Sequence, residues 1–108
     1  MEKDLQKILS MLRKLLPYII QKYQVNSIEV FGSYVRNQQN KSSDLDILVT
    51  FTKIPSLIKF LELKNYLSDQ LQINVDLVMK DSLKPRISPY ILDESIPVWK
   101  NKEIIQLS

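Results

Sequence analysis

The chain has 108 residues, 44% of them hydrophobic, which is enough for one compact domain with a core but not for two, so we expect a single domain over residues 1–108. It contains no cysteine and no histidine, which excludes disulfides, thiolate or histidine-based nucleophilic catalysis and the usual zinc sites, and leaves carboxylates with hard cations as the leading chemistry. The net charge of +3 comes from lysines scattered along the chain, a distribution typical of a solvated surface, so nucleic-acid binding is not expected.

The first predicted element is an amphipathic helix. Its apolar residues recur at three- and four-residue steps, which predicts a stripe packed on the core. These residues are Leu5, Ile8, Leu9, Leu12, Leu15, Leu16, Ile19 and Ile20. Pro17 lies inside the pattern and cannot donate a hydrogen bond to the carbonyl of Arg13, so we expect a kink or a break near Leu16.

Two strands are predicted next, joined by a polar loop over residues 37–43. Residues 27–31 are β-branched and aromatic and stop at Gly32, the only glycine, which predicts a strand that ends in a tight turn. The second strand covers residues 44–51. Its alternation places Asp44, Asp46, Leu48 and Thr50 on one face, and Leu45, Ile47, Val49 and Phe51 on the other.

A second helix and a third strand follow. Pro55-Ser56 predicts a helix start with Ser56 as N-cap, and the helix should extend to about Asp69. We expect Leu57, Phe60, Leu61 and Leu67 to form its buried stripe. In the strand over residues 73–79, Ile73, Val75, Leu77 and Met79 share one face, and Asn74, Asp76 and Val78 share the other.

The C-terminal region is less regular. Pro85 and Pro89 lie among apolar residues between 81 and 95, which predicts a helix that begins after one of the prolines. Residues 96–99 predict an edge strand, where a proline is tolerated, and the last nine residues are weakly specified. The order is therefore helix, strand, strand, helix, strand, helix. No secretory signal and no window of about 18 apolar residues is present, so we expect a cytoplasmic protein without a membrane span.

Two patterns predict chemistry. Asp44 and Asp46 point to the same side of a strand with Cα atoms roughly 6–7 Å apart, so both could touch one metal ion. Gly32-Ser33 directly follows a strand, where the glycine permits close backbone approach and the serine hydroxyl can meet a phosphate. Taken alone, the acid pair is more often a turn cap with a solvent-facing neighbour, and Gly-Ser is more often an ordinary turn. The joint pattern is much rarer and indicates a nucleotide-and-metal site.

The stretches 30–36 and 43–49 resemble the DNA polymerase beta-like nucleotidyltransferase superfamily, and most closely its short stand-alone members, the minimal nucleotidyltransferases. The resemblance continues through residues 75–78, 83–86 and 89–91, so it covers most of the chain. It implies an α/β (α+β) nucleotidyltransferase fold, with a small mixed β-sheet flanked by helices.

The resemblance also implies site residues. Asp44, Asp46 and Asp76 would hold two Mg²⁺ ions and carry catalysis, since two ions can stabilise the attacking and leaving oxygens of an in-line displacement. Gly32 and Ser33 would contact the nucleotide triphosphate, which is ATP in many members of the family. The strand pattern supports Asp76 independently, because Asp76 interrupts an apolar run and faces away from it. The alternative for Asp76 is an exposed acid on an edge strand.

Two positions depart from the family pattern, which has a small residue followed by Arg-Gly where this chain has Val35-Arg36-Asn37. Val35 makes the pocket wall bulkier, and Asn37 tolerates positive φ well enough to keep the same turn. Arg36 is a candidate nucleotide-binding residue, although an arginine after such a loop could equally lie on the surface.

The leading hypothesis is transfer of AMP from ATP to a hydroxyl, expected to be that of a tyrosine, on a HEPN-domain toxin, with this chain as the antitoxin of the pair. The short chain leaves no room for a substrate domain, which favours an acceptor on a separate macromolecule. The alternative is a binding module that keeps the fold and neutralises its partner by contact alone. Nucleotide addition to RNA is a third possibility, disfavoured by the lack of a basic stripe. The sequence leaves open a monomer, a homo-oligomer or a hetero-oligomer.

Overall fold

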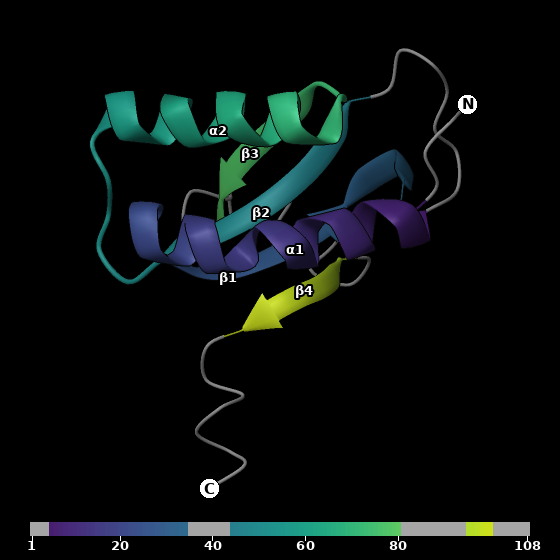
Figure 1. Ribbon diagram of the computed structural model, residues 1–108, viewed down its shortest axis with the longest axis horizontal. Coiled ribbons are helices and arrows are strands. Elements are labelled where there is room, and N and C mark those ends of the chain that lie inside the picture. The colour runs from purple at the N-terminus through teal and green to yellow at the C-terminus, as the bar shows by residue number, and fades with distance from the viewer. Residues whose placement is uncertain (1–4, 35–43, 81–94, 101–108) are drawn as a thin grey trace, which may run out of the picture.

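The structure, a computed structural model, describes residues 5–34, 44–80 and 95–100 (Figure 1). The described elements are α1 (Leu5–Tyr23), β1 (Val25–Phe31), a short 3-10 turn (Gly32–Tyr34), β2 (Leu45–Phe51), α2 (Leu57–Leu71), β3 (Val75–Met79) and β4 (Ile96–Lys100). The helix predicted between residues 81 and 95 and the loop over 37–43 lie outside the described residues, as do Val35, Arg36 and Asn37.

The strands form one mixed sheet in the order β3-β2-β1-β4. β1 is antiparallel to both β2 and β4, whereas β2 and β3 are parallel. Figure 1 shows α1 and α2 on the same side of this sheet. We call the sheet surface turned away from the two helices the far face. The mixed sheet with helices confirms the predicted fold class, and β4 confirms the predicted edge strand with its proline, Pro97.

The core lies between the helices and the sheet. It contains aliphatic side chains of α1 and α2 and of β1, β2 and β3, among them Ile8, Leu12, Ile19, Ile28, Val30, Leu45, Ile47, Val49, Leu63, Leu67, Val75 and Leu77. The alternation predicted for β2 and β3 is therefore confirmed. Among the described residues, no helix is both long enough and apolar enough to cross a membrane.

α1 continues through Pro17 to Tyr23, so the break that was one of two expected outcomes does not occur. A proline inside a helix loses one hydrogen bond and costs about 3 kcal/mol. Burial of Leu12 and Leu16 before it, and of Ile19 and Tyr23 after it, offsets that cost because both halves of the helix are held against the same core. Pro17 itself is exposed.

α2 begins as predicted, with Ser56 as N-cap accepting a hydrogen bond from the Lys59 amide at 3.2 Å. The predicted buried stripe was wrong for Leu57 and Leu61, which are both exposed. The buried residues of α2 are Leu63, Leu67 and Leu71, with Phe60 packed beside them. Each residue turns a helix by about 100°, so the helix carries two apolar rows, and only one of them faces the sheet.

Candidate active site

The register of the sheet brings two of the predicted carboxylates side by side. Asp46 of β2 pairs with Asp76 of the parallel strand β3. Paired residues on neighbouring strands point to the same face and lie one strand spacing apart, about 4.8 Å. Both project on the far face, since the residues flanking them in each strand are core residues. Asp46 is half-buried and Asp76 is exposed.

The turn after β1 is pressed against Asp46. Phe31, the last residue of β1, pairs with Asp46, and Gly32 follows with a φ of +84°. A Cβ atom at Gly32 would lie 2.9 Å from Cγ of Asp46 and would overlap its Oδ2 atom. The backbone angle and the lack of space both require glycine, so the predicted close approach at Gly32 exists, and its partner here is the Asp46 carboxylate.

Asp44 lies outside this pair. It is exposed, it precedes β2, and its Oδ1 accepts a hydrogen bond from Nδ2 of Asn74 at 3.0 Å. The same asparagine accepts a backbone hydrogen bond from Leu45 at 2.9 Å, so Asn74 ties the start of β2 to the start of β3. Within the residues that the structure describes, no group of three or more Asp or Glu side chains is arranged to hold a metal ion. The predicted three-carboxylate set is thus assembled only in part.

The donor set nevertheless suits a divalent cation. Carboxylate oxygens are the ligands that hard cations such as Mg²⁺ prefer. Two like charges on adjacent strands repel each other, and partial burial of Asp46 adds a desolvation penalty that a cation would relieve. Of the predicted nucleotide-binding residues, Gly32 lies beside this pair and Ser33 follows it in the 3-10 turn. Arg36 lies outside the described residues.

A buried charge on the far face was not predicted from the sequence. Glu29 of β1 is only 3% exposed. Its Oε2 accepts a hydrogen bond from Lys80 Nζ at 2.7 Å, and its Oε1 accepts one from the Ser95 hydroxyl at 2.7 Å. Glu29 pairs with Leu48, two residues along β2 from Asp46. The only signal in the sequence is a glutamate between two β-branched residues of a strand; its partners are 51 and 66 residues away.

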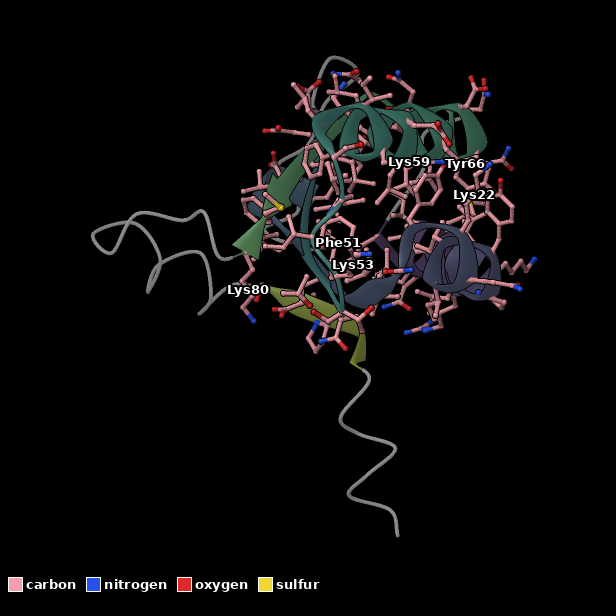
Figure 2. All side chains as sticks on the ribbon, turned by 90° about the vertical axis from the view of Figure 1, so that its left-hand side faces the viewer. Lys22, Phe51, Lys53, Lys59, Tyr66 and Lys80 are labelled. Atoms are coloured by element: carbon pink, nitrogen blue, oxygen red, sulfur yellow. The ribbon has the colours of Figure 1, made fainter. Side chains whose placement is uncertain are left out.

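A second polar cluster joins the two helices, on the other side of the sheet. The Tyr23 hydroxyl donates a hydrogen bond to Glu62 Oε2 at 2.8 Å, and Lys22 and Lys59 lie within 3.8 Å of the same oxygen. Figure 2 shows Lys22 and Lys59 with Tyr66 along the line where α1 and α2 meet.

The pKa values in this cluster follow from its contacts. The hydrogen bond from Tyr23 holds the pKa of Glu62 below its ordinary value, and burial of the phenol raises the pKa of Tyr23. A hydrogen bond with Tyr18 is the main cause of the raised pKa of Lys22. These groups lie in the helix layer, whereas Asp46 and Asp76 lie on the far face. The cluster therefore serves helix packing.

Comparison with known proteins supports the nucleotidyltransferase fold that the sequence predicted. The family model described as the nucleotidyltransferase domain matches residues 12–98. This span includes most of α1, all of α2 and the Gly32, Asp46 and Asp76 positions. The chain belongs to the nucleotidyltransferase domain family.

Individual relatives are more specific. The chain is 51% identical over 78 residues to the protein adenylyltransferase MntA of Thermococcus cleftensis, a match that covers 72% of this chain and 79% of that one. Among solved structures, it resembles a toxin-antitoxin with AMP-PNP, with a TM-score of 0.73, 27% identity and coverage of 92% and 78% of the two chains. It also resembles a complex of tri-AMPylated Shewanella oneidensis HEPN toxin with MNT antitoxin, with a TM-score of 0.67, 25% identity and coverage of 94% and 77%.

Proposed function

We propose that this chain is a metal-dependent protein adenylyltransferase that transfers AMP from ATP to a tyrosine hydroxyl of a HEPN-domain toxin and acts as its antitoxin in the cytoplasm. The observation that carries the proposal is the pairing of Asp46 with Asp76 beside the Gly32 turn. Support comes from the adenylyltransferase relative and from the two toxin-antitoxin structures that the chain resembles.

In the proposed reaction, the acceptor oxygen forms a bond to the α-phosphorus of ATP, and the bond from that phosphorus to diphosphate breaks. Asp46 and Asp76 would hold Mg²⁺, joined by Asp44 if its side chain leaves Asn74. The bound ions would supply positive charge to the attacking and leaving oxygens. Asp76 is the more exposed carboxylate of the pair, so it is the one an incoming hydroxyl would reach and the proposed acceptor of its proton.

Gly32 and Ser33 are assigned to the triphosphate in this proposal. The glycine leaves no side chain between the turn and the carboxylate, so a phosphate held by the turn would lie near the metal ligands. Arg36 is proposed to add a cation to the same phosphates. Charge-assisted contacts of this kind orient the α-phosphorus toward the acceptor.

The test uses the purified chain, ATP labelled on its α-phosphate, Mg²⁺ and the HEPN-domain protein encoded beside it. Label should appear on that protein, and it should disappear in Asp46→Asn and on addition of a chelator. Asp69→Asn is the matched control, because it makes the same change at an exposed aspartate of α2. Absence of label with the wild-type chain would refute the enzymatic proposal. Loss of label when the partner's tyrosines are changed to phenylalanine would identify the acceptor group, and unlabelled tRNA in the same mixture tests RNA as the acceptor.

A second candidate function is neutralisation by contact alone. The engagement of Asp44 by Asn74, which leaves only two carboxylates adjacent, favours it. Under this alternative, Asp44→Ala still neutralises the toxin in cells, and metal-dependent ATP binding is absent. Loss of neutralisation in Asp44→Ala, with partner binding retained, supports the enzyme instead.

A further inference from the structure

We propose that an exposed aliphatic surface on α2 is where the acceptor protein docks, and that this partner presents apolar side chains ringed by acidic ones. The surface consists of Ile54, Leu57, Ile58 and Leu61 and is called the α2 patch below. The inference rests on the proposed function to the extent that the acceptor is a separate protein.

The α2 patch is unusual for its continuity. The four side chains are 70%, 72%, 77% and 45% exposed. They fall within eight residues, and Leu57, Ile58 and Leu61 lie on adjacent turns of one helix. Single exposed aliphatic residues are ordinary, whereas a contiguous group on a small domain marks an interaction surface. The residues of α2 that are buried in the core are Leu63, Leu67 and Leu71, so the α2 patch lies outside that core.

The α2 patch lies on the helix that packs beside β3, the strand that carries Asp76 of the candidate active site. Glu62 and Tyr66 of α2 contact Tyr23 and Tyr18 of α1. At about 100° per residue, Leu57 and Leu61 are therefore on the flank of α2 that faces away from α1. α2 packs beside β3, as the hydrogen bond from the Val75 amide to Ser68 Oγ at 3.0 Å records.

β3 is the last strand on that side of the sheet (Figure 1). It also carries Asp76, which projects on the far face. Ser68, which contacts the start of β3, follows Leu57 and Leu61 by eleven and seven residues. The α2 patch is therefore about 10–17 Å further along the helix axis than the Asp76 end of β3, as well as on the other side of the sheet. A protein partner seated on the α2 patch can reach around this edge and offer a hydroxyl to the site, whereas a small molecule cannot span the two.

The charged side chains around the α2 patch indicate which kind of protein binds there. Lys53 precedes it, and Lys64 follows Leu61 by one turn on the same flank. Among the described residues neither lysine forms an ion pair. Glu62, the acid that follows Leu61, already contacts Tyr23, Lys22 and Lys59. The next acid of α2, Asp69, is two turns beyond Leu61. A second copy of the chain would bring lysines against lysines, whereas acidic side chains around an apolar centre would pair with them. The geometry therefore points to a different protein as the occupant.

The experiment measures binding of the HEPN-domain protein by calorimetry in the Asp46→Asn background without ATP, so that no transfer takes place. Ile58→Lys should weaken binding by about 10-fold or more, because it places a charge in the apolar centre. Gln21→Lys adds the same charge on the exposed face of α1 and should change binding by less than about twofold. Ile58→Leu, which keeps the aliphatic surface, should bind like the parent. Circular dichroism confirms that each variant is folded.

The double variant Lys53→Glu/Lys64→Glu tests the chemistry of the partner. It should weaken binding, and the loss should shrink as salt is raised, because exposed charges are screened. Tighter binding, or a loss that does not change with salt, would contradict the proposal that the partner carries acidic side chains around its apolar ones.

Two further outcomes overturn the docking surface. In one, Ile58→Lys binds the HEPN-domain protein as tightly as the parent, or the parent does not bind that protein at all. In the other, sedimentation shows that the chain self-associates and that Ile58→Lys abolishes only this self-association, which would make a second copy the occupant. Binding that depends on Ile58, found together with no AMP transfer by the wild-type chain, would refute the proposed function and leave the docking surface standing.

Discussion

The two faces of the β-sheet differ in the side chains they carry. The face under the helices is lined by aliphatic side chains, such as Val30, Ile47 and Val75, which are all fully buried. On the far face, the positions beside them in the same strands carry Glu29, Asp46 and Asp76. Each of these three strands thus places one carboxylate on the far face, next to a core residue.

This difference separates stability from function. Burial of aliphatic side chains is the main favourable contribution to folding. Carboxylates held side by side oppose folding unless they are paired or bound to a cation. Glu29 is paired with Lys80 and Ser95, and Asp46 lies beside Asp76 on the adjacent strand. Charges arranged in this way are characteristic of functional sites, and variants on the two faces should therefore affect different measurements.

The largest effect is expected for Asp76→Asn on the far face. The variant keeps the shape of the side chain but removes a proposed metal ligand, so AMP transfer should fall by about 1,000-fold or more. The free energy of unfolding, measured in urea without divalent cations, should stay the same or rise slightly because a repulsion is removed. A clear loss of stability would show that Asp76 has a structural role and would contradict the separation of the two faces.

The next effect is expected on the other face. Leu67→Ala empties a fully buried position in α2 and should lower the free energy of unfolding by about 3 kcal/mol. Leu57→Ala is the matched control in the same helix; it removes the same atoms from an exposed position and should cost less than about 0.5 kcal/mol. Denaturant unfolding curves measure both. Equal losses would mean that Leu57 is buried like Leu67, as the sequence pattern predicted.

This pair of leucines shows where sequence analysis reaches its limit. The N-cap at Ser56 and the alternation in β2 are local, and both were predicted correctly. α2, however, carries two apolar rows, and the choice between them depends on where the sheet and α1 lie. Local periodicity alone does not contain that information.

The candidate site likewise has features that the local sequence predicts and features that depend on the fold. The Asp-x-Asp spacing and the Gly-Ser turn are local, so their residues could be named in advance. The pairing of Asp46 with Asp76 follows from strand register, which the alternation of Asp76 anticipated. The engagement of Asp44 by Asn74, 30 residues away, is a tertiary contact, as is the burial of Glu29. Neither could be predicted without the fold.

Glu29→Ala should have an intermediate effect. Removing the carboxylate leaves Lys80 and the Ser95 hydroxyl without this partner in a half-buried site, at a cost of about 2 kcal/mol. The cost is limited because the Lys80 side chain keeps 28% of its exposure and stays partly solvated. Glu29→Gln retains an acceptor for Ser95 and should cost about half as much. Denaturant unfolding distinguishes them. If the two variants are equal, the charge of Glu29, and not its hydrogen bonding, accounts for the loss.

The smallest effect is expected for Tyr23→Phe in the helix layer. The variant loses the hydrogen bond to Glu62 and should cost about 1 kcal/mol near neutral pH. Because this bond lowers the pKa of Glu62 in the folded state, its contribution is present above the unfolded pKa of about 4.3 and is lost as pH falls through the lower folded value.

At alkaline pH, the stability contribution of Tyr23 decreases as pH rises instead of as pH falls. The pKa of Tyr23 is raised in the folded state, mainly by burial, so the contribution of the neutral phenol is present below the unfolded pKa of about 10 and is lost as pH rises above it. The difference in unfolding free energy between wild type and Tyr23→Phe should therefore be greatest between about pH 5 and 9 and smaller at both ends. A difference that does not change with pH would show that the substitution disturbs packing instead. AMP transfer should be unaffected in either case, because Tyr23 is in the helix layer and the carboxylates are on the far face.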